Sequence, residues 1–124
     1  IFKKNKLFLL DNNKNYINTY KKSNLMITDL SGTAYTYSFL TKKPVIFLSV
    51  NENKIQNSNY NQLNYFIDRH KIGNIVTNEK KLINSIKNCY KYRKKFEKQI
   101  NLLIRQNKLL ENSYKLTIKA IKKI

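Results

Sequence analysis

The sequence predicts an α/β protein whose core is a doubly wound parallel sheet followed by C-terminal helices. Two short, continuous apolar runs occupy residues 25–28 and 45–48, and such runs are typical of strands buried on both faces of a parallel sheet. Segments with helical periodicity stand between and after these runs. Strands that alternate with helices in this way indicate an α/β sheet, in which ligands bind beyond the carboxyl ends of the strands.

The first half of the chain supplies the elements on which this prediction depends. A compact apolar strand at 25–28 ends at Asp29, and the next helix opens at Ser31 and stops before Pro44. Val45 begins a second central strand. The remaining predicted elements of this half are a short strand at 8–10 and a short helix at 14–22.

The second half continues the alternation with less distinct signals. Residues 49–59 are polar and rich in asparagine, which predicts a surface loop at the end of the second strand. Helices are then expected at 60–70 and 79–90, with Gly73 ending the first and an edge strand at 74–77. The C-terminal part predicts one apolar helical stripe from Phe96, Ile100, Leu103 and Ile104, a break near Asn112 and Ser113, and a second stripe from Tyr114, Ile118 and Ile121.

Composition limits the function classes. One Cys and one His exclude an internal disulfide and an ordinary structural zinc site, and no apolar run approaches the ~20 residues of a membrane-spanning helix. The formal charge of +18 invites a nucleic-acid interpretation, but 22 Lys against 3 Arg is a poor match to recognition by the planar Arg fork. We therefore expect no specific nucleic-acid partner, no metal and no cofactor.

A basic stripe is the second consequence of this composition. Lysines at suitable spacing are expected to fall along one side of a continuous helix, where they could contact an anionic membrane surface or a polyanionic acceptor. An ordinary solvated face of a lysine-rich protein explains the same spacing. The stripe consists of Lys80, Lys87, Lys91, Lys94 and Lys98.

The segment between the first two central strands carries the strongest functional signal. Ser31, Gly32 and Thr33 lie where a buried strand gives way to a helix. The unpaired N–H groups and partial positive charge of a helix N-terminus bind phosphate if the backbone can approach it, and a glycine permits that approach. Taken alone, the triplet fits better with a capped helix in which the glycine eases a tight turn.

The wider pattern resembles a known family. Residues 25–35, LMITDLSGTAY, followed by KPVIF at 43–47, look like the signature of CDP-glycerol glycerophosphotransferases: a strand, T/S-D-x-S-S/G, a helix and K/R-P before the next strand. The segment also resembles, more loosely, the S-G-G…K-P-V region of UDP-N-acetylglucosamine 2-epimerases and other GT-B enzymes. The resemblance covers roughly residues 14–90. The acidic residues that follow S-G-G in the epimerases are replaced here by Tyr35, Thr36 and Tyr37, which argues against epimerase chemistry.

The resemblance implies that two parts of the chain have different roles. Residues 1–90 would form the Rossmann-like, donor-nucleotide-binding domain of the C-terminal half of a GT-B fold, and residues 91–124 would pack on it as helices or cross to a missing N-terminal domain. The donor diphosphate would be held by Ser31, Gly32 and Thr33, with Asp29 orienting their loop. The histidine motif of the N-terminal half is absent, so the catalytic residues are unknown and we expect the fragment to be inactive alone.

The resemblance also implies a function. The enzyme would transfer a group from a nucleotide-activated donor, CDP-glycerol or a nucleotide sugar, to a cell-envelope or capsular polymer. It would act in the cytoplasm or peripherally on the inner face of the cell membrane. The alternative is a basic, non-enzymatic module that binds nucleic acid or anionic membrane, and its binding would collapse with salt.

Four other residues are candidates of a second rank. Asn51 and Glu52 follow the second central strand, where a carboxylate could accept hydrogen bonds from a ribose, although a solvated loop is an equal interpretation. His70 is expected to be a surface residue at a helix end rather than a catalytic acid or base. Cys89 is expected to be a buried small apolar group.

Overall fold

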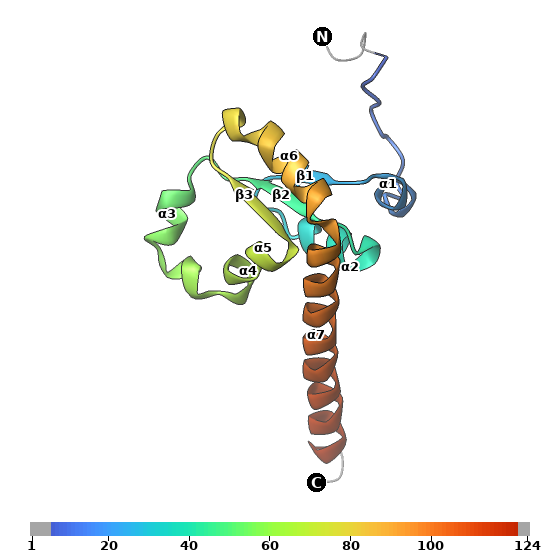
Figure 1. Cartoon of the computed structure of the whole chain (residues 1–124). Coiled ribbons are helices and arrows are strands. Elements are labelled where there is room, and N and C mark those ends of the chain that lie inside the picture. The colour runs from blue at the N-terminus through green and yellow to red at the C-terminus, as the bar shows by residue number, and fades with distance from the viewer. Residues whose placement is uncertain (1–5, 122–124) are drawn as a thin grey trace.

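The computed structural model describes residues 6–121, and over 109–121 it describes the course of the helix without the side chains. Its centre is a parallel sheet of three strands in the order β1-β2-β3 (Figure 1). The predicted α/β class is confirmed, and the run at 45–48 is the central strand, as expected. The strands are β1 (Met26–Thr28), β2 (Val45–Leu48) and β3 (Gly73–Val76).

Helices cover both faces of the sheet. Ile46 and Asn74 are neighbours in the strand register and share one face, which α6 (Leu82–Lys91) covers. The amide of Asn74 donates hydrogen bonds to the Ser85 hydroxyl at 3.2 Å and to the Cys89 sulfur at 3.4 Å. Phe47 points to the opposite face, because side chains alternate along a strand, and there it meets the helices that connect β2 to β3.

Helix α2 (Thr33–Thr41) connects β1 to β2, as the sequence predicts. Its buried positions, Ala34, Tyr37 and Ser38, recur at helical spacing and face the core. The helix ends at Lys42, whose left-handed φ of 60° turns the chain toward Pro44 and β2. Helix α1 (Ile17–Lys22) packs beside α2, confirming the helix expected before β1.

The connection from β2 to β3 differs most from its prediction. The loop expected at 49–59 contains helix α3 (Glu52–Gln56), which forms because Glu52 and Ile55 are buried against the domain. The single helix expected at 60–70 is a 3-10 turn, η2 (Asn59–Gln62), followed by two short helices that meet at Asp68. These are α4 (Asn64–Ile67) and α5 (Arg69–Ile72).

The C-terminal part also corrects two expectations. A short 3-10 turn, η3 (Glu79–Lys81), leads into α6, and the chain leaves helical geometry at Tyr92 before α7 (Arg93–Ile121) begins. The lysine stripe is therefore divided between η3, α6 and α7 and does not lie on one continuous helix. The break expected near Asn112 and Ser113 does not occur, because both residues are tolerated within a helix at modest cost.

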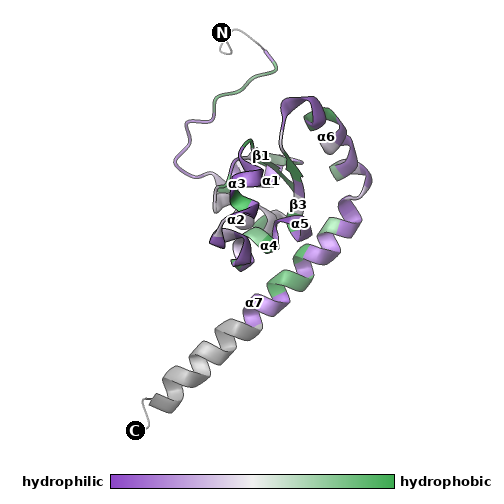
Figure 2. Cartoon of the chain, turned by 90° about the vertical axis from the view of Figure 1, so that its left-hand side faces the viewer, coloured by the Kyte–Doolittle hydropathy of each residue, from purple (hydrophilic) through white to green (hydrophobic). Residues whose placement is uncertain are grey.

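Helix α7 packs on the domain along its first turns and then extends beyond it. Phe96, Ile100 and Leu103 are buried at helical spacing against α2 and α5, which confirms the predicted stripe. Burial of each such side chain contributes roughly 1.5–3 kcal/mol. Figure 1 shows the helix running on beyond the sheet, and Figure 2 shows α6 and the first turns of α7 alternating between hydrophilic and hydrophobic colours.

The N-terminal edge of the sheet is less buried than the sequence predicts. The prediction of a strand at 8–10 is wrong, because these residues form irregular chain outside the sheet. Consequently β1 is an edge strand, and its Ile27 is 47% exposed although the sequence predicts a strand buried on both faces. Ile27 shares a face with Ile46, but α6 packs mainly on β2 and β3.

Candidate functional site

The three parallel strands end at one edge of the sheet, and the predicted site residues follow two of them. Thr28 ends β1 and leads into Ser31–Thr33, and Leu48 ends β2 and leads into Asn51. Because the strands are parallel, these segments share the carboxyl edge, where α/β sheets bind their ligands. The structure therefore brings both groups of predicted residues to the same edge.

Ser31 and Thr33 form a compact polar turn at the start of α2. Their hydroxyl oxygens lie 2.8 Å apart, and the N–H of Thr33 donates to the Ser31 oxygen at 3.3 Å. The N–H groups of Ala34 and Tyr35 bond to the carbonyls three residues earlier, so the helix begins with a tight turn. Within the described residues the N–H groups of Ser31 and Gly32 bond to no protein atom. They remain available to an anion.

Gly32 faces open space. A Cβ placed on it would meet no atom within 4 Å, and its φ of −60° and ψ of −20° suit any residue. The interpretation of Gly32 as easing a tight turn therefore has no support in its backbone. Instead, the absence of a side chain leaves the first turn of α2 accessible to a ligand.

Asp29 lies at the same edge and is exposed. Its carboxylate accepts a hydrogen bond from the Thr28 hydroxyl at 3.5 Å, which is the outer limit of such a contact. Among the described residues it makes no hydrogen bond to Ser31, Gly32 or Thr33. The expected role of Asp29 in orienting this loop thus remains a prediction.

Asn51 and Glu52 are adjacent in sequence but differ in surroundings. Asn51 is exposed where the chain leaves β2, whereas Glu52 is 8% exposed. One carboxylate oxygen of Glu52 accepts from Nη1 of Arg69 at 3.0 Å and the other from Nη2 at 2.8 Å. The amide of Gln56 donates to the same carboxylate at 2.8 Å. Both oxygens of Glu52 are thus engaged within the protein.

The electrostatics of Glu52 follow from this pairing. Burial favours its neutral form, but the hydrogen bonds from Arg69 and Gln56 and the charge of Arg69 outweigh burial and lower the pKa of Glu52 to about 2. The carboxylate is therefore ionised at neutral pH and neutralises the guanidinium beside it.

Arg69 is the feature at this edge that sequence reasoning missed. In the run Asp68–Lys71 it reads as part of a charged helix end, yet it is completely buried. Its guanidinium carbon lies 5.8 Å from the ring centre of Phe47 and 5.1 Å from that of Phe66. Its identity is the one available signal, because Arg is rare in this lysine-rich sequence and its planar fork suits a buried pair with a carboxylate.

The connection between β2 and β3 is also joined to the helix that carries the glycine. The Tyr35 hydroxyl, on α2, donates a hydrogen bond to the carbonyl of Tyr65, on α4. Their rings pack with centres 5.1 Å apart. Burial raises the pKa of Tyr35, so this hydroxyl stays protonated and remains a donor at neutral pH. The segments that follow β1 and β2 are thus linked.

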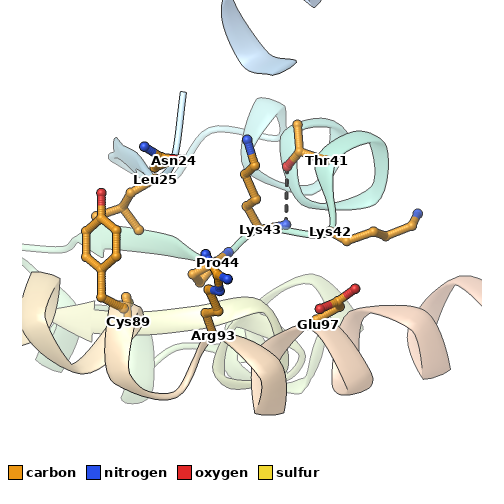
Figure 3. Close-up of a pocket in the computed structure, with 10 residues that line it drawn as sticks. Asn24, Leu25, Thr41, Lys42, Lys43, Pro44, Cys89, Arg93 and Glu97 are labelled. Atoms are coloured by element: carbon orange, nitrogen blue, oxygen red, sulfur yellow. Dashed lines mark hydrogen bonds between the residues drawn. The ribbon is translucent and has the colours of Figure 1, made fainter. Parts of the chain in front are cut away.

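A cavity of about 210 Å³ lies at the other end of the sheet (Figure 3). Leu25 and Pro44, which precede β1 and β2, line it together with Lys43, Arg93 and Glu97. The N–H of Lys43 donates to the Thr41 hydroxyl at 3.2 Å on its wall. Its position at the amino ends of the strands separates it from the open surface around Gly32.

The remaining candidates behave as expected. His70 is exposed in the last turn of α5, a surface residue at a helix end. Cys89 is 1% exposed, and burial raises its pKa to about 11, so its thiol is unreactive at neutral pH. Among the described residues, no three His, Cys, Asp or Glu side chains group as metal ligands do. Nor does any helix in that part of the chain have the length and apolarity to cross a membrane.

Comparison with known proteins agrees with this geometry. The model of the family described as CDP-glycerol:poly(glycerophosphate) glycerophosphotransferase matches residues 2–111, which is most of the chain. No curated protein and no solved structure matches the chain. The matched region includes the whole sheet, the polar turn at the start of α2 and the buried pair at the end of β2. The chain therefore belongs to the CDP-glycerol glycerophosphotransferase family.

Proposed function

We propose that this domain binds the nucleotide-activated donor, CDP-glycerol or a close relative, with the donor diphosphate at the N-terminus of α2. The observation that carries the proposal is the open first turn of that helix. In the part of the chain that the structure describes, Ser31 and Gly32 present N–H groups without protein partners, and a Cβ on Gly32 would meet open space. The position at the carboxyl edge of a parallel sheet supports the same assignment.

The chemistry of this turn suits the donor diphosphate and the nucleoside monophosphate that leaves when the bond between the two phosphates breaks. The partial positive charge at a helix N-terminus stabilises negative charge, and the hydroxyls of Ser31 and Thr33 add two donors beside it. As the glycerophosphate leaves the donor, charge grows on the remaining nucleotide, and preorganised donors stabilise that charge. This part of the transfer needs no metal. Asp29 and Asn51, exposed at the same edge, complete the proposed donor site.

The other partners of the reaction follow from the family. We infer that the acceptor is a glycerophosphate-type polymer of the cell envelope or capsule, and that a second domain closes the open surface and supplies the catalytic groups. On this proposal the chain alone binds donor without turnover. Its excess of positive charge would bring the enzyme to the inner face of the cell membrane, where an anionic acceptor accumulates.

The test is a calorimetric titration of the chain with CDP-glycerol, CDP, a UDP-sugar and a short oligonucleotide at two salt concentrations. We expect saturable binding of the cytidine nucleotides that survives the higher salt. In Gly32→Val, the added side chain occupies the space of the diphosphate, so this binding is lost. Thr36→Val is the matched control, because Thr36 is exposed on the same helix one turn further on and should leave binding unchanged.

Two outcomes contradict the proposal. Nucleotide binding that is equal in the wild-type chain and in Gly32→Val would remove α2 from the donor site. Oligonucleotide binding that disappears with salt, together with no nucleotide binding, would instead support the basic-module alternative, in which affinity depends on released counterions.

A further inference from the structure

The buried pair of Glu52 and Arg69 links the beginning and the end of the connection between β2 and β3. Glu52 is in the first turn after β2, and Arg69 begins α5, the last helix before β3. Their two hydrogen bonds, at 2.8 and 3.0 Å, join the two ends of this connection. The side chain of Arg69 is 1% exposed and that of Glu52 10%, so the contact is shielded from water.

The geometry requires an arginine. A guanidinium donates two parallel hydrogen bonds to one carboxylate, and it can lie over aromatic rings, as it does here over Phe47 and Phe66. A lysine would place a single charged point in the same space. A buried ion pair of this kind contributes little net stability, since desolvation offsets the attraction. Its clear effect is geometric, because it fixes where the chain after β2 must run.

What the pair fixes is the loop at the carboxyl edge. Asn51 directly precedes Glu52 and is exposed, while the carboxylate of Glu52 is turned inward. Both oxygens of Glu52 already accept hydrogen bonds from Arg69 or Gln56, and the buried carboxylate is therefore committed to the protein interior. Asn51 is the exposed polar side chain that lies between the end of β2 and the anchored Glu52. Its amide can both donate to and accept from the hydroxyls of a sugar.

We propose that Arg69 is a positioning residue of the donor site: through Glu52 it holds Asn51 where the amide hydrogen-bonds the ribose hydroxyls of the nucleotide donor. This inference rests on the proposed function and names the residues that serve its sugar. The hydrogen bond from Tyr35 to the Tyr65 carbonyl carries the same restraint to α2. The diphosphate turn and the ribose contact are thereby held in a fixed relation.

The experiment compares variants that separate positioning from stability. Arg69→Met alone leaves a buried carboxylate without its partner and is expected to unfold the chain. The double variant Glu52→Leu with Arg69→Met replaces the pair by apolar groups of similar size, which commonly preserves stability. Arg105→Met, at an exposed arginine of α7, is the matched control.

Two readouts are measured on the folded variants. The first is the rate of tryptic cleavage after Lys54, an exposed residue of α3, relative to cleavage after Lys87 of α6. We expect cleavage after Lys54 to become about tenfold faster in the double variant, with Lys87 unchanged, because α3 opens once it is no longer held. In Arg105→Met neither rate changes.

The second readout is affinity for CDP-glycerol. We expect the double variant and Asn51→Ala each to weaken it about three- to tenfold, the scale of one hydrogen bond. Combining Asn51→Ala with the double variant should weaken it little further, because Arg69 acts through Asn51 and the effects are then not additive. A merely structural pair would show full affinity in the stable double variant.

The outcomes distinguish the positioning role of Arg69 from the proposed donor binding on which it rests. Wild-type affinity in the folded double variant, or fully additive losses with Asn51→Ala, would overturn the positioning role while leaving donor binding intact. Failure of the wild-type chain to bind any nucleotide would overturn the proposed function, and this inference with it. Unchanged cleavage after Lys54 would overturn the claim that the pair holds the loop, whether or not nucleotide binds.

Discussion

Gly73 and Gly32 are the two glycines of the chain, and their surroundings differ completely. A Cβ on Gly73 would lie 1.8 Å from the carbonyl oxygen of Val45, in the neighbouring strand, whereas one on Gly32 would meet nothing within 4 Å. Gly73 is therefore required by the contact between β2 and β3. No contact within the described part of the chain requires a glycine at position 32, which agrees with its proposed role in the donor site.

The backbone angles strengthen this distinction. Both glycines adopt conformations open to other residues, since Gly73 is extended and Gly32 is helical, so neither is needed for its φ. The difference between them is one of space alone. A glycine that the fold does not use, at the start of a helix and at the ligand-binding edge of a parallel sheet, indicates close approach of a bound group.

The largest expected effect is that of Gly73→Ala. The added methyl group overlaps backbone that cannot move without separating β2 from β3, so we expect a loss of about 3 kcal/mol or more in the free energy of unfolding. Urea denaturation followed by circular dichroism measures it. A variant as stable as the wild-type chain would show that the sheet is more widely spaced at Val45 than we describe.

The second effect reverses the pattern. Gly32→Val should change the free energy of unfolding by no more than about 1 kcal/mol, because the side chain points into solvent and the position lies at the helix cap. The same variant should lose donor binding, whereas Gly73→Ala would affect binding through unfolding alone. Substantial destabilisation by Gly32→Val would contradict the separation of the two roles.

How far the sequence predicts this molecule depends on how local each signal is. The central strand, α2 and the polar turn at Ser31–Thr33 are encoded by neighbouring residues, and these predictions hold in the structure. The apolar run at 25–28 could not reveal that β1 lies at an edge, since strand order depends on contacts distant in sequence. The sequence also could not distinguish the roles of the two glycines, because the open space around Gly32 is a property of the folded chain.

The connection between β2 and β3 shows the same limit more sharply. Residues 49–59 predict a surface loop and residues 60–70 a helix that ends in charged residues, yet Glu52 and Arg69 are both buried. Charged residues are rarely buried unless they are paired. Glu52 and Arg69 pair with each other across 17 residues of sequence, a separation that periodic patterns do not detect. The scarcity of Arg beside Lys singles out three positions but does not distinguish the buried Arg69 from the exposed Arg105.

The third prediction concerns acid and the stability of that connection. The folded-state pKa of Glu52 is about 2, below its ordinary value of 4.5, so its contribution to stability is full above about pH 4.5 and is lost as the pH falls toward 2. The double variant Glu52→Leu with Arg69→Met lacks this contribution. Its free energy of unfolding should fall less across that range than that of the wild-type chain, and parallel curves would contradict the assignment.

The smallest effect uses Cys89 as a reporter of the sheet. Its thiol is buried beside Asn74, the residue after Gly73, and burial raises its pKa to about 11. A disulfide reagent at pH 8 should label it slowly in the wild-type chain and at the same rate in Gly32→Val. Gly73→Ala should label quickly. Fast labelling of Gly32→Val would mean that the start of α2 supports the sheet after all.

The most direct test of the central claim is an amide NMR titration of the ¹⁵N-labelled chain with CDP-glycerol, because it reports which edge of the sheet the donor meets. We expect the largest shifts at the N–H groups of Ser31, Gly32 and Thr33, with smaller shifts at Asn51. Lys43 and Arg93, at the opposite cavity, should not respond. Shifts confined to that cavity, with none at the start of α2, would contradict the assignment of the donor site.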